Sequence, residues 1–195
     1  MVYAKIVDKE DCFVAQNKNF NITINLKGCV DKWVLNETNS NLLKESGFCD
    51  LIKNGDVELS FKDEDCYSNS RSTSVSFQIE QDFFTLRKVY SVTNNAFISD
   101  IYIQPKTDIN YSYFTFANFS NVDFFMIEDK KYVDDVSIKT DNMLIVNGDY
   151  YLGCIFKECD VYAKYNPEHF LVKYEFNLNL KKNELFRIYF KFALV

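Results

Sequence analysis

Strict alternation of apolar and polar side chains near the end of the chain constrains the fold more than any other feature. From Phe170 to Leu180 every second residue is apolar, and the alternation returns before Val195, after the polar stretch Lys181 to Glu184. A period of two places the apolar side chains on one face of a β-strand and the polar ones on the other. We therefore predict a β-hairpin with one buried face, so that the domain closes with its own last strand.

Short strand signals of the same kind recur along the chain. An opening hairpin is predicted around Gly28, and the run from 39 to 52 is predicted to be a loop with at most one short turn. Residues 62 to 74 are charged and hydroxyl-rich, which indicates an exposed excursion. Regularly spaced strands without intervening helices are typical of an antiparallel sandwich. The predicted fold class is all-β, with two antiparallel sheets packed as a sandwich.

The composition supports a single folded domain over residues 1–195. The chain is 47% hydrophobic and 17% aromatic, and its length allows roughly 70% of the unfolded surface to be buried. Only 5 glycines and 2 prolines are present, which leaves no flexible linker. The turns are instead rich in Asn, Asp, Ser and Lys.

Charge and hydropathy exclude two classes of partner. The formal net charge is −6, and no run of Lys and Arg is long enough to follow a phosphate backbone, so we expect no nucleic acid. No segment approaches the ~20 apolar residues of a membrane span. Residues 1–10 are polar and do not form a signal peptide. These observations favour a cytoplasmic protein, with a secreted or virion protein as the alternative if a signal peptide was removed.

The cysteines leave two interpretations open. Free thiols in a reducing compartment are favoured, because Cys29 and Cys154 sit beside glycine in apolar segments, where cysteine behaves as a small hydrophobic residue. The alternative is a secreted, disulfide-bonded domain, and the sequence does not choose among the pairings. Four Asn-x-Ser/Thr sequons support this alternative, at Asn21, Asn36, Asn110 and Asn118. The six cysteines are Cys12, Cys29, Cys49, Cys66, Cys154 and Cys159.

No motif predicts catalysis, a metal or a cofactor. There is one histidine, His169, which we expect in a surface loop, and there is no Cys-x-x-Cys, Gly-x-Ser-x-Gly or glycine-rich phosphate loop. Paired carboxylates for glycoside chemistry depend on a three-dimensional separation. The carboxylates available for such a pair all fall in predicted turns, where we expect solvation: Glu37, Glu80, Glu128, Asp134 and Asp135.

Aromatic side chains are the one feature that points to binding. Flat rings stack on sugars and anchor protein partners at low entropic cost, although an aromatic sandwich core is the favoured explanation for most of them. The aromatic residues considered for exposure are Trp33, Tyr67, Tyr102, Tyr111, Tyr113, Tyr150 and Tyr151. From these, Trp33, Tyr111, Tyr113 and Tyr150 are the candidate ligand-binding residues.

Three segments carry a family resemblance. They are NFNITINLKGCVDKW at 19–33, FTLRKVYSVTNN at 84–95 and NLKKNEL at 179–185. Their order resembles the N-terminal β-supersandwich of glucoamylase-like glycoside hydrolases. The resemblance implies two antiparallel sheets stacked face to face. It assigns no catalytic residue, because the carboxylates of that family lie on a helical barrel that follows the sandwich.

We therefore expect a non-catalytic, carbohydrate-associated β-sandwich that binds or scaffolds, with a carbohydrate or a protein as its partner. The alternative is a secreted or virion sandwich that engages a protein partner. A small glycosidase with its carboxylates on a concave sheet is the least favoured hypothesis.

Overall fold

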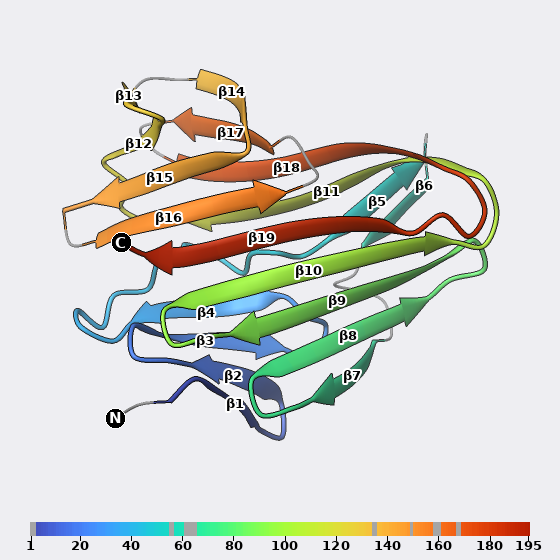
Figure 1. Ribbon diagram of the computed structural model, residues 1–195, viewed down its shortest axis with the longest axis horizontal. Coiled ribbons are helices and arrows are strands. Elements are labelled where there is room, and N and C mark those ends of the chain that lie inside the picture. The colour runs from blue at the N-terminus through green and yellow to red at the C-terminus, as the bar shows by residue number, and fades with distance from the viewer. Residues whose placement is uncertain are drawn as a thin grey trace.

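Three antiparallel β-sheets build the protein (Figure 1). The computed structural model describes residues 3–54, 57–60, 66–133, 136–148, 150–157, 161–166 and 169–195. Each strand pair is antiparallel, and no helix occurs within these ranges. The predicted all-β, antiparallel fold class is confirmed.

The strands form two layers. A nine-stranded sheet is one layer, and a four-stranded and a six-stranded sheet lie behind it in the view of Figure 1. In order, the nine-stranded sheet contains β13 (Lys130–Tyr132), β12 (Phe124–Ile127), β15 (Asn142–Asn147), β16 (Tyr150–Lys157), β19 (Phe186–Leu194), β10 (Ala96–Pro105), β9 (Phe84–Val92), β8 (Ser74–Glu80) and β7 (Tyr67–Ser70). The second layer thus consists of two sheets, where the sequence predicted one.

The second layer is built mostly from the first and last thirds of the chain. The four-stranded sheet contains β1 (Lys5–Asp8), β2 (Cys12–Gln16), β3 (Phe20–Asn25) and β4 (Val30–Leu35). The six-stranded sheet contains β14 (Val136–Thr140), β17 (Val161–Asn166), β18 (His169–Leu180), β11 (Ile109–Phe119), β5 (Leu51–Asn54) and β6 (Val57–Ser60). The predicted opening hairpin is confirmed as β3 and β4.

Two of the connections between the layers are neighbouring arches. β10 passes to β11 and β18 passes to β19, and in each case the two strands belong to different sheets. The predicted closing hairpin is therefore wrong, since β18 pairs with β11 and β17 while β19 pairs with β10 and β16. In an arch the apolar faces of the two strands oppose each other across the core. The period of two is the same in a hairpin and in an arch, so alternation does not distinguish them.

Polar contacts hold the two arches together. The Asn183 N–H donates to the Pro105 carbonyl at 2.9 Å, and the Lys182 N–H donates to Asp108 Oδ1 at 2.9 Å. Lys181 Nζ contacts Asp108 Oδ2 at 3.2 Å. The bond from the Lys182 N–H, with that from Lys181, holds the pKa of Asp108 below its usual range. The layers are therefore joined at this end by neighbouring crossovers.

Trp33 lies in the core where the three sheets meet. Its ring is fully buried and packs edge-on against Phe20 of β3, Phe97 of β10 and Phe192 of β19, with centroid distances of 5.6, 5.3 and 5.3 Å. Phe119 of β11 lies 6.3 Å away. Each such pair adds about 0.5–1.5 kcal/mol beyond the burial of area. Trp33 therefore contacts all three sheets.

The segment between β4 and β5 joins the two sheets of the second layer. Asn41 forms an isolated bridge with Val34 of β4, and Leu43 forms another with Phe119 of β11. The predicted loop over 39–52 is confirmed as far as Asp50, and β5 begins at the next residue, Leu51.

A buried ion pair lies between the layers. Lys88 of β9 pairs with Asp50, and their side chains are 3% and 1% exposed. Lys88 Nζ also donates to the carbonyls of Gly28 and Phe48, at 3.0 and 2.6 Å. Phe48 has φ 57°, which is unusual for a bulky residue and places its carbonyl toward the lysine. The ammonium thus has three buried acceptors.

Two tyrosines complete this polar cluster. Tyr90 donates its hydroxyl to the Gly28 carbonyl at 2.8 Å, and Tyr113 donates to Asp50 Oδ1. Burial, reinforced by the Asp50 charge, raises the pKa of both phenols well above the usual range. A tyrosine in such a site stays neutral and acts as a hydrogen-bond donor.

A disulfide joins Cys29 and Cys49, whose Cα atoms are 4.8 Å apart. The expectation that Cys29 is a free thiol is therefore wrong. An apolar strand surrounds a free cysteine and a disulfide equally well, and the fold of the segment after β4 brings Cys49 to it. Cys12, Cys66 and Cys154 are free thiols, whereas Cys159 lies outside the described residues.

Three strands depart from the sequence prediction. β1 and β2 precede the first predicted strand, and β2 has three consecutive buried residues. β7 lies within the predicted excursion of 62–74 and is an edge strand with mostly exposed side chains. Residues 62–65 of that excursion lie outside the described part of the chain. Short or polar edge strands carry too little apolar pattern to be recognised.

Candidate functional site

The solvent-facing side of the nine-stranded sheet, called the outer face below, carries the candidate site. Strand alternation creates this face: Phe97, Ile101 and Ile103 of β10 are buried, while Asp100 and Tyr102 point the other way. On β19 the same alternation buries Ile188, Phe190 and Phe192 and leaves Arg187, Tyr189 and Lys191 on the outer face. The cross-strand register then places these outward side chains in rows.

An ion pair lies between two tyrosines at the centre of the outer face. Tyr102 is directly opposite Arg187, and Asp100 is directly opposite Tyr189. Arg187 donates from Nε and Nη2 to Asp100 Oδ1, at 2.8 and 2.6 Å. Its guanidinium carbon lies 5.8 Å from the Tyr102 ring centroid and 5.5 Å from that of Tyr189. Partial burial and the Asp100 charge raise the pKa of Tyr189, with Arg187 opposing.

This arrangement fixes the orientation of the central side chains. Both arginine bonds end on Oδ1, so within the described residues Asp100 Oδ2 accepts no hydrogen bond. The Asp100 side chain is 17% exposed and that of Arg187 is 42% exposed. The centre therefore offers a carboxylate acceptor, a guanidinium donor and two aromatic rings within a small area.

A groove of about 580 Å³ lies beside this centre. Its floor is apolar and is formed on the outer face by Met126, Leu144, Gly153, Ile155 and Ala193. A Cβ added at Gly153 would lie 3.1 Å from Val195 Cγ2, so a larger residue would crowd the floor. Lys191 lines the groove, and Tyr189 of the ion-pair centre precedes it by two residues on the same face of β19, so the groove and the centre are neighbours on the outer face.

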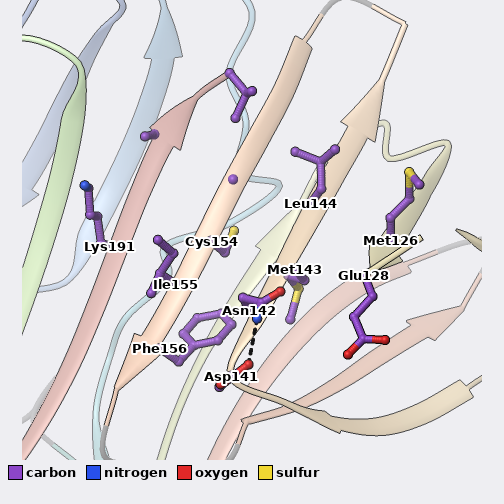
Figure 2. Close-up of a pocket in the computed structure, with 13 residues that line it drawn as sticks. Met126, Glu128, Asp141, Asn142, Met143, Leu144, Cys154, Ile155, Phe156 and Lys191 are labelled. Carbon is purple, nitrogen blue, oxygen red and sulfur yellow. Dashed lines mark hydrogen bonds between the residues drawn. The ribbon is translucent and has the colours of Figure 1, made fainter. Parts of the chain in front are cut away.

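Polar groups gather at one end of the groove (Figure 2). Glu128, Asp141 and Asn142 lie where β12 ends and β15 begins, and Asn142 Nδ2 donates to Asp141 Oδ1 at 2.7 Å. All three side chains are exposed. Two carboxylates thus border one apolar concavity, and among the described residues no group of three or more metal-ligating side chains occurs.

The four candidate ligand-binding residues lie elsewhere. Trp33, Tyr113 and Tyr150 are 0%, 0% and 6% exposed, because alternation in their strands directs them into the core. The expectation that these rings are exposed is therefore wrong. Tyr111 is half-buried and packs against Phe83 at 5.4 Å, and its role in binding stays a prediction.

The strand register brings three of the other predicted residues, Tyr67, Tyr102 and Tyr151, to the outer face. Tyr67 and Tyr151 are 86% and 51% exposed, and Tyr102 belongs to the aromatic centre. Glu80 pairs with Lys106 at 2.8 Å, and hydrogen bonds from Lys106 and Thr85 lower the pKa of its carboxyl. Asp134 and Asp135 lie outside the described residues, and His169 begins β18 where a loop was expected.

Sequence reasoning missed Tyr189 and the Asp100–Arg187 pair. A signal for Tyr189 is present, since Arg187, Tyr189 and Lys191 alternate with the core residues of the last strand. The pairing of β10 with β19 is not in the local pattern, because 87 residues separate Asp100 from Arg187.

Comparison with known proteins shows the fold but no sequence family. No protein-family model and no curated protein sequence matches the chain. Among solved structures, galactose 1-epimerase from Lactobacillus acidophilus matches with a TM-score of 0.71 at 8% identity, over 100% of this chain and 99% of that one. The GalM/aldose epimerase homologue from C. elegans matches with a TM-score of 0.67 at 7% identity, over 91% and 96%.

A larger enzyme contains the same architecture. The 4-α-glucanotransferase of Thermococcus litoralis matches with a TM-score of 0.72 at 10% identity, over 100% of this chain, which spans 40% of that enzyme. These matches define the class of fold: the protein has the galactose mutarotase-like β-supersandwich fold, which proteins related to carbohydrate chemistry share. Within the described residues, no helix is long and apolar enough to cross a membrane.

Proposed function

We propose that the protein is a non-catalytic carbohydrate-binding module and that the outer face of the nine-stranded sheet is its binding surface. The observation that carries the proposal is the Asp100–Arg187 ion pair between Tyr102 and Tyr189. A pyranose ring presents an apolar face of C–H groups and a rim of hydroxyls. The two tyrosine rings can stack on the apolar C–H face, and the carboxylate and guanidinium can form hydrogen bonds with the hydroxyl rim.

Preorganisation supports the proposal. Asp100 and Arg187 hold each other in place, so a saccharide that binds them orders little that was free before. The adjoining groove extends the surface beyond a single sugar ring and ends at the polar groups of Glu128, Asp141 and Asn142. An open sheet face with one apolar groove suits an oligosaccharide.

The fold supports the carbohydrate class and leaves the ligand open. The structures with the same fold include a galactose 1-epimerase and a 4-α-glucanotransferase. The resemblance of three sequence segments to the β-supersandwich of glucoamylase-like hydrolases points the same way, since that domain accompanies a separate catalytic barrel. This resemblance supports an accessory binding role.

The binding test uses two variants and a matched control. Calorimetric titration with neutral oligosaccharides should show binding that Tyr102→Ala and Tyr189→Ala each weaken by about tenfold, or about 1.4 kcal/mol. Tyr3→Ala is the control, because Tyr3 is 69% exposed and lies outside the outer face. Equal affinities for all three variants and the wild type would refute the assignment to the outer face.

Aldose epimerisation is a second candidate function, favoured by one observation. Glu128 and Asp141 border the same groove, and interconversion of anomers needs a general acid and a general base on either side of the sugar (Figure 2). Both side chains are exposed, however, whereas a carboxyl that acts as a general acid is usually held in an apolar environment.

Anomer exchange separates the two functions. The wild-type protein should leave the rate of galactose or glucose mutarotation, followed by polarimetry, at its value in buffer. An acceleration that Glu128→Gln or Asp141→Asn abolishes would establish the enzyme and overturn the non-catalytic assignment. A sandwich that engages a protein partner, the other alternative, stays a prediction.

A further inference from the structure

A second concavity on the outer face contains two arginines. It lies over β7, β8 and β9, beyond the aromatic centre as seen from the groove, and has a volume of about 210 Å³. At ~30 Å³ per molecule, about seven waters would fill it. That is room for one charged group and part of a sugar ring. Its lining residues are Asn69, Arg71, Ser74, Ser76, Arg87 and Val89.

Neither arginine is neutralised by a neighbour. Both side chains are exposed, and no carboxylate of the described residues forms an ion pair with either guanidinium. The acidic groups of neighbouring strands contact other residues: Glu80 pairs with Lys106, and Asp100 pairs with Arg187. A chain of net charge −6 thus places two uncompensated cations in one concavity.

The strands and turn that hold the arginines are fixed by backbone bonds. The Arg71 N–H donates to the Ser74 carbonyl at 2.7 Å, which closes the turn between β7 and β8. The Ser72 carbonyl accepts from the Ile6 N–H of β1 at 2.7 Å, and the Thr73 carbonyl accepts from Val92 of β9 at 2.9 Å. The turn is therefore tied to two other strands.

The cross-strand register aligns the donors. Asn69 is opposite Ser76, and Ser76 is opposite Val89. Arg87 lies two residues from Val89 on the same face, so it is a diagonal neighbour of Ser76, within reach of a long side chain. Two guanidiniums, two serine hydroxyls and one amide thereby line one concavity, in which the Ser76 hydroxyl donates to the Asn69 carbonyl at 3.4 Å.

We propose that this pocket binds an oxyanion, the sulfate ester or carboxylate of an acidic saccharide. A guanidinium presents paired N–H donors that match two oxygens of such a group, and the Ser74 hydroxyl and the Asn69 amide can donate to the remaining oxygen. The inference rests on the proposed function for the saccharide part of the ligand and on the two arginines for its charge. The ligand of the outer face is then an acidic glycan.

Titration of the full chain with three probes tests this inference. The probes are dextran oligosaccharides, the same oligosaccharides carrying sulfate esters, and oligogalacturonides. The charged probes should bind at least about tenfold more tightly than neutral dextran, since hydrogen bonds to charged groups are the stronger ones. Arg71→Gln and Arg87→Gln should each remove about tenfold of that affinity and leave binding of the neutral probe unchanged.

Two further variants separate geometry from charge. Arg87→Lys keeps the positive charge but not the paired N–H donors. Its affinity for the charged probes should therefore lie between that of the wild type and that of Arg87→Gln. Lys32→Gln removes one positive charge from an exposed position on β4 and should leave the affinity for the charged probes unchanged. Higher affinity for sulfate esters than for carboxylates, or the reverse, would identify the source of the anion.

Three outcomes are decisive. Equal binding of neutral and charged probes, or arginine variants that behave like Lys32→Gln, would overturn the anion site and leave saccharide binding intact. Charged probes that bind through Arg87 but are insensitive to Tyr102→Ala would support the anion site and overturn the aromatic saccharide site. If no probe binds, both proposals fail.

Discussion

Replacement of Lys88 by methionine should destabilise the protein more than a substitution at any exposed lysine. Methionine has similar length and fills the same space, so the cavity contribution is small. The change leaves the Asp50 carboxylate, 1% exposed, with the Tyr113 hydroxyl as its remaining partner. Removing one partner of a buried ion pair costs about 3–5 kcal/mol.

The carbonyls around the ammonium add to this loss. Phe48 O loses the donor that lay 2.6 Å away, and an unpaired buried acceptor costs about 1–3 kcal/mol. Gly28 O is affected less, because it keeps the hydrogen bond from Tyr90 at 2.8 Å. The total expected for Lys88→Met is therefore about 4–8 kcal/mol in the free energy of unfolding.

A double variant distinguishes an uncompensated charge from a simple loss of packing. In Lys88→Met with Asp50→Asn, the amide can still accept from Tyr113 and no buried charge remains. We expect the double variant to lose only about 1–3 kcal/mol, so that it is more stable than Lys88→Met alone. This order is the opposite of that expected for independent losses, which would add.

Urea denaturation followed by the fluorescence of Trp33 measures these differences, since the chain has 1 tryptophan and it lies in the core. Lys32→Met, at an exposed position, is the control and should stay within about 0.5 kcal/mol of wild type. A loss below about 1 kcal/mol for Lys88→Met, or a double variant less stable than the single one, would refute the reasoning.

Three further predictions concern the core and the disulfide. Reduction of the disulfide, or replacement of Cys29 and Cys49 by alanine, should lower the free energy of unfolding by about 3 kcal/mol, because the bridge closes a loop with a sequence separation of 20. Cys12→Ser is the control and should leave this free energy unchanged. An unchanged urea midpoint on reduction would argue against the bridge. Burial raises the pKa of Tyr113, so the contribution of its neutral hydroxyl to the free energy of unfolding is full below about pH 10 and is lost as pH rises through the folded-state pKa. Tyr113→Phe should therefore make the alkaline loss of stability less steep. An unchanged slope would count against this burial. Acrylamide should quench Trp33 weakly and its emission should be blue-shifted, whereas quenching like that of free indole would contradict its burial.

The period of two was enough to predict the fold class, because it depends only on which side chains are buried. It identified β3 and β4 as a hairpin and separated the two faces of β9 and β10. It could not show that β18 and β19 lie in different layers, since their apolar faces alternate in the same way in a hairpin. That distinction depends on contacts between Pro105, Asp108 and the turn at 181–184, which are remote in sequence.

The candidate site was predicted less well, and for a related reason. Aromatic residue type does not reveal on which face of its strand a ring lies, so Trp33 and Tyr113 were selected although both point into the core. Tyr189 was overlooked because it lies between core residues. The Asp100–Arg187 pair and the Arg71–Arg87 pocket arise from strand pairing, which a single sequence does not encode locally.

Mapping of amide chemical shifts during a saccharide titration tests the central claim most directly. We expect the perturbed amides to cluster on the outer face, at Asp100, Tyr102, Arg187 and Tyr189 and along the adjoining groove, with little change in the four-stranded sheet. Perturbations confined to the four-stranded or six-stranded sheet, or none at saturating concentrations of neutral and acidic oligosaccharides, would contradict the claim that this face binds carbohydrate.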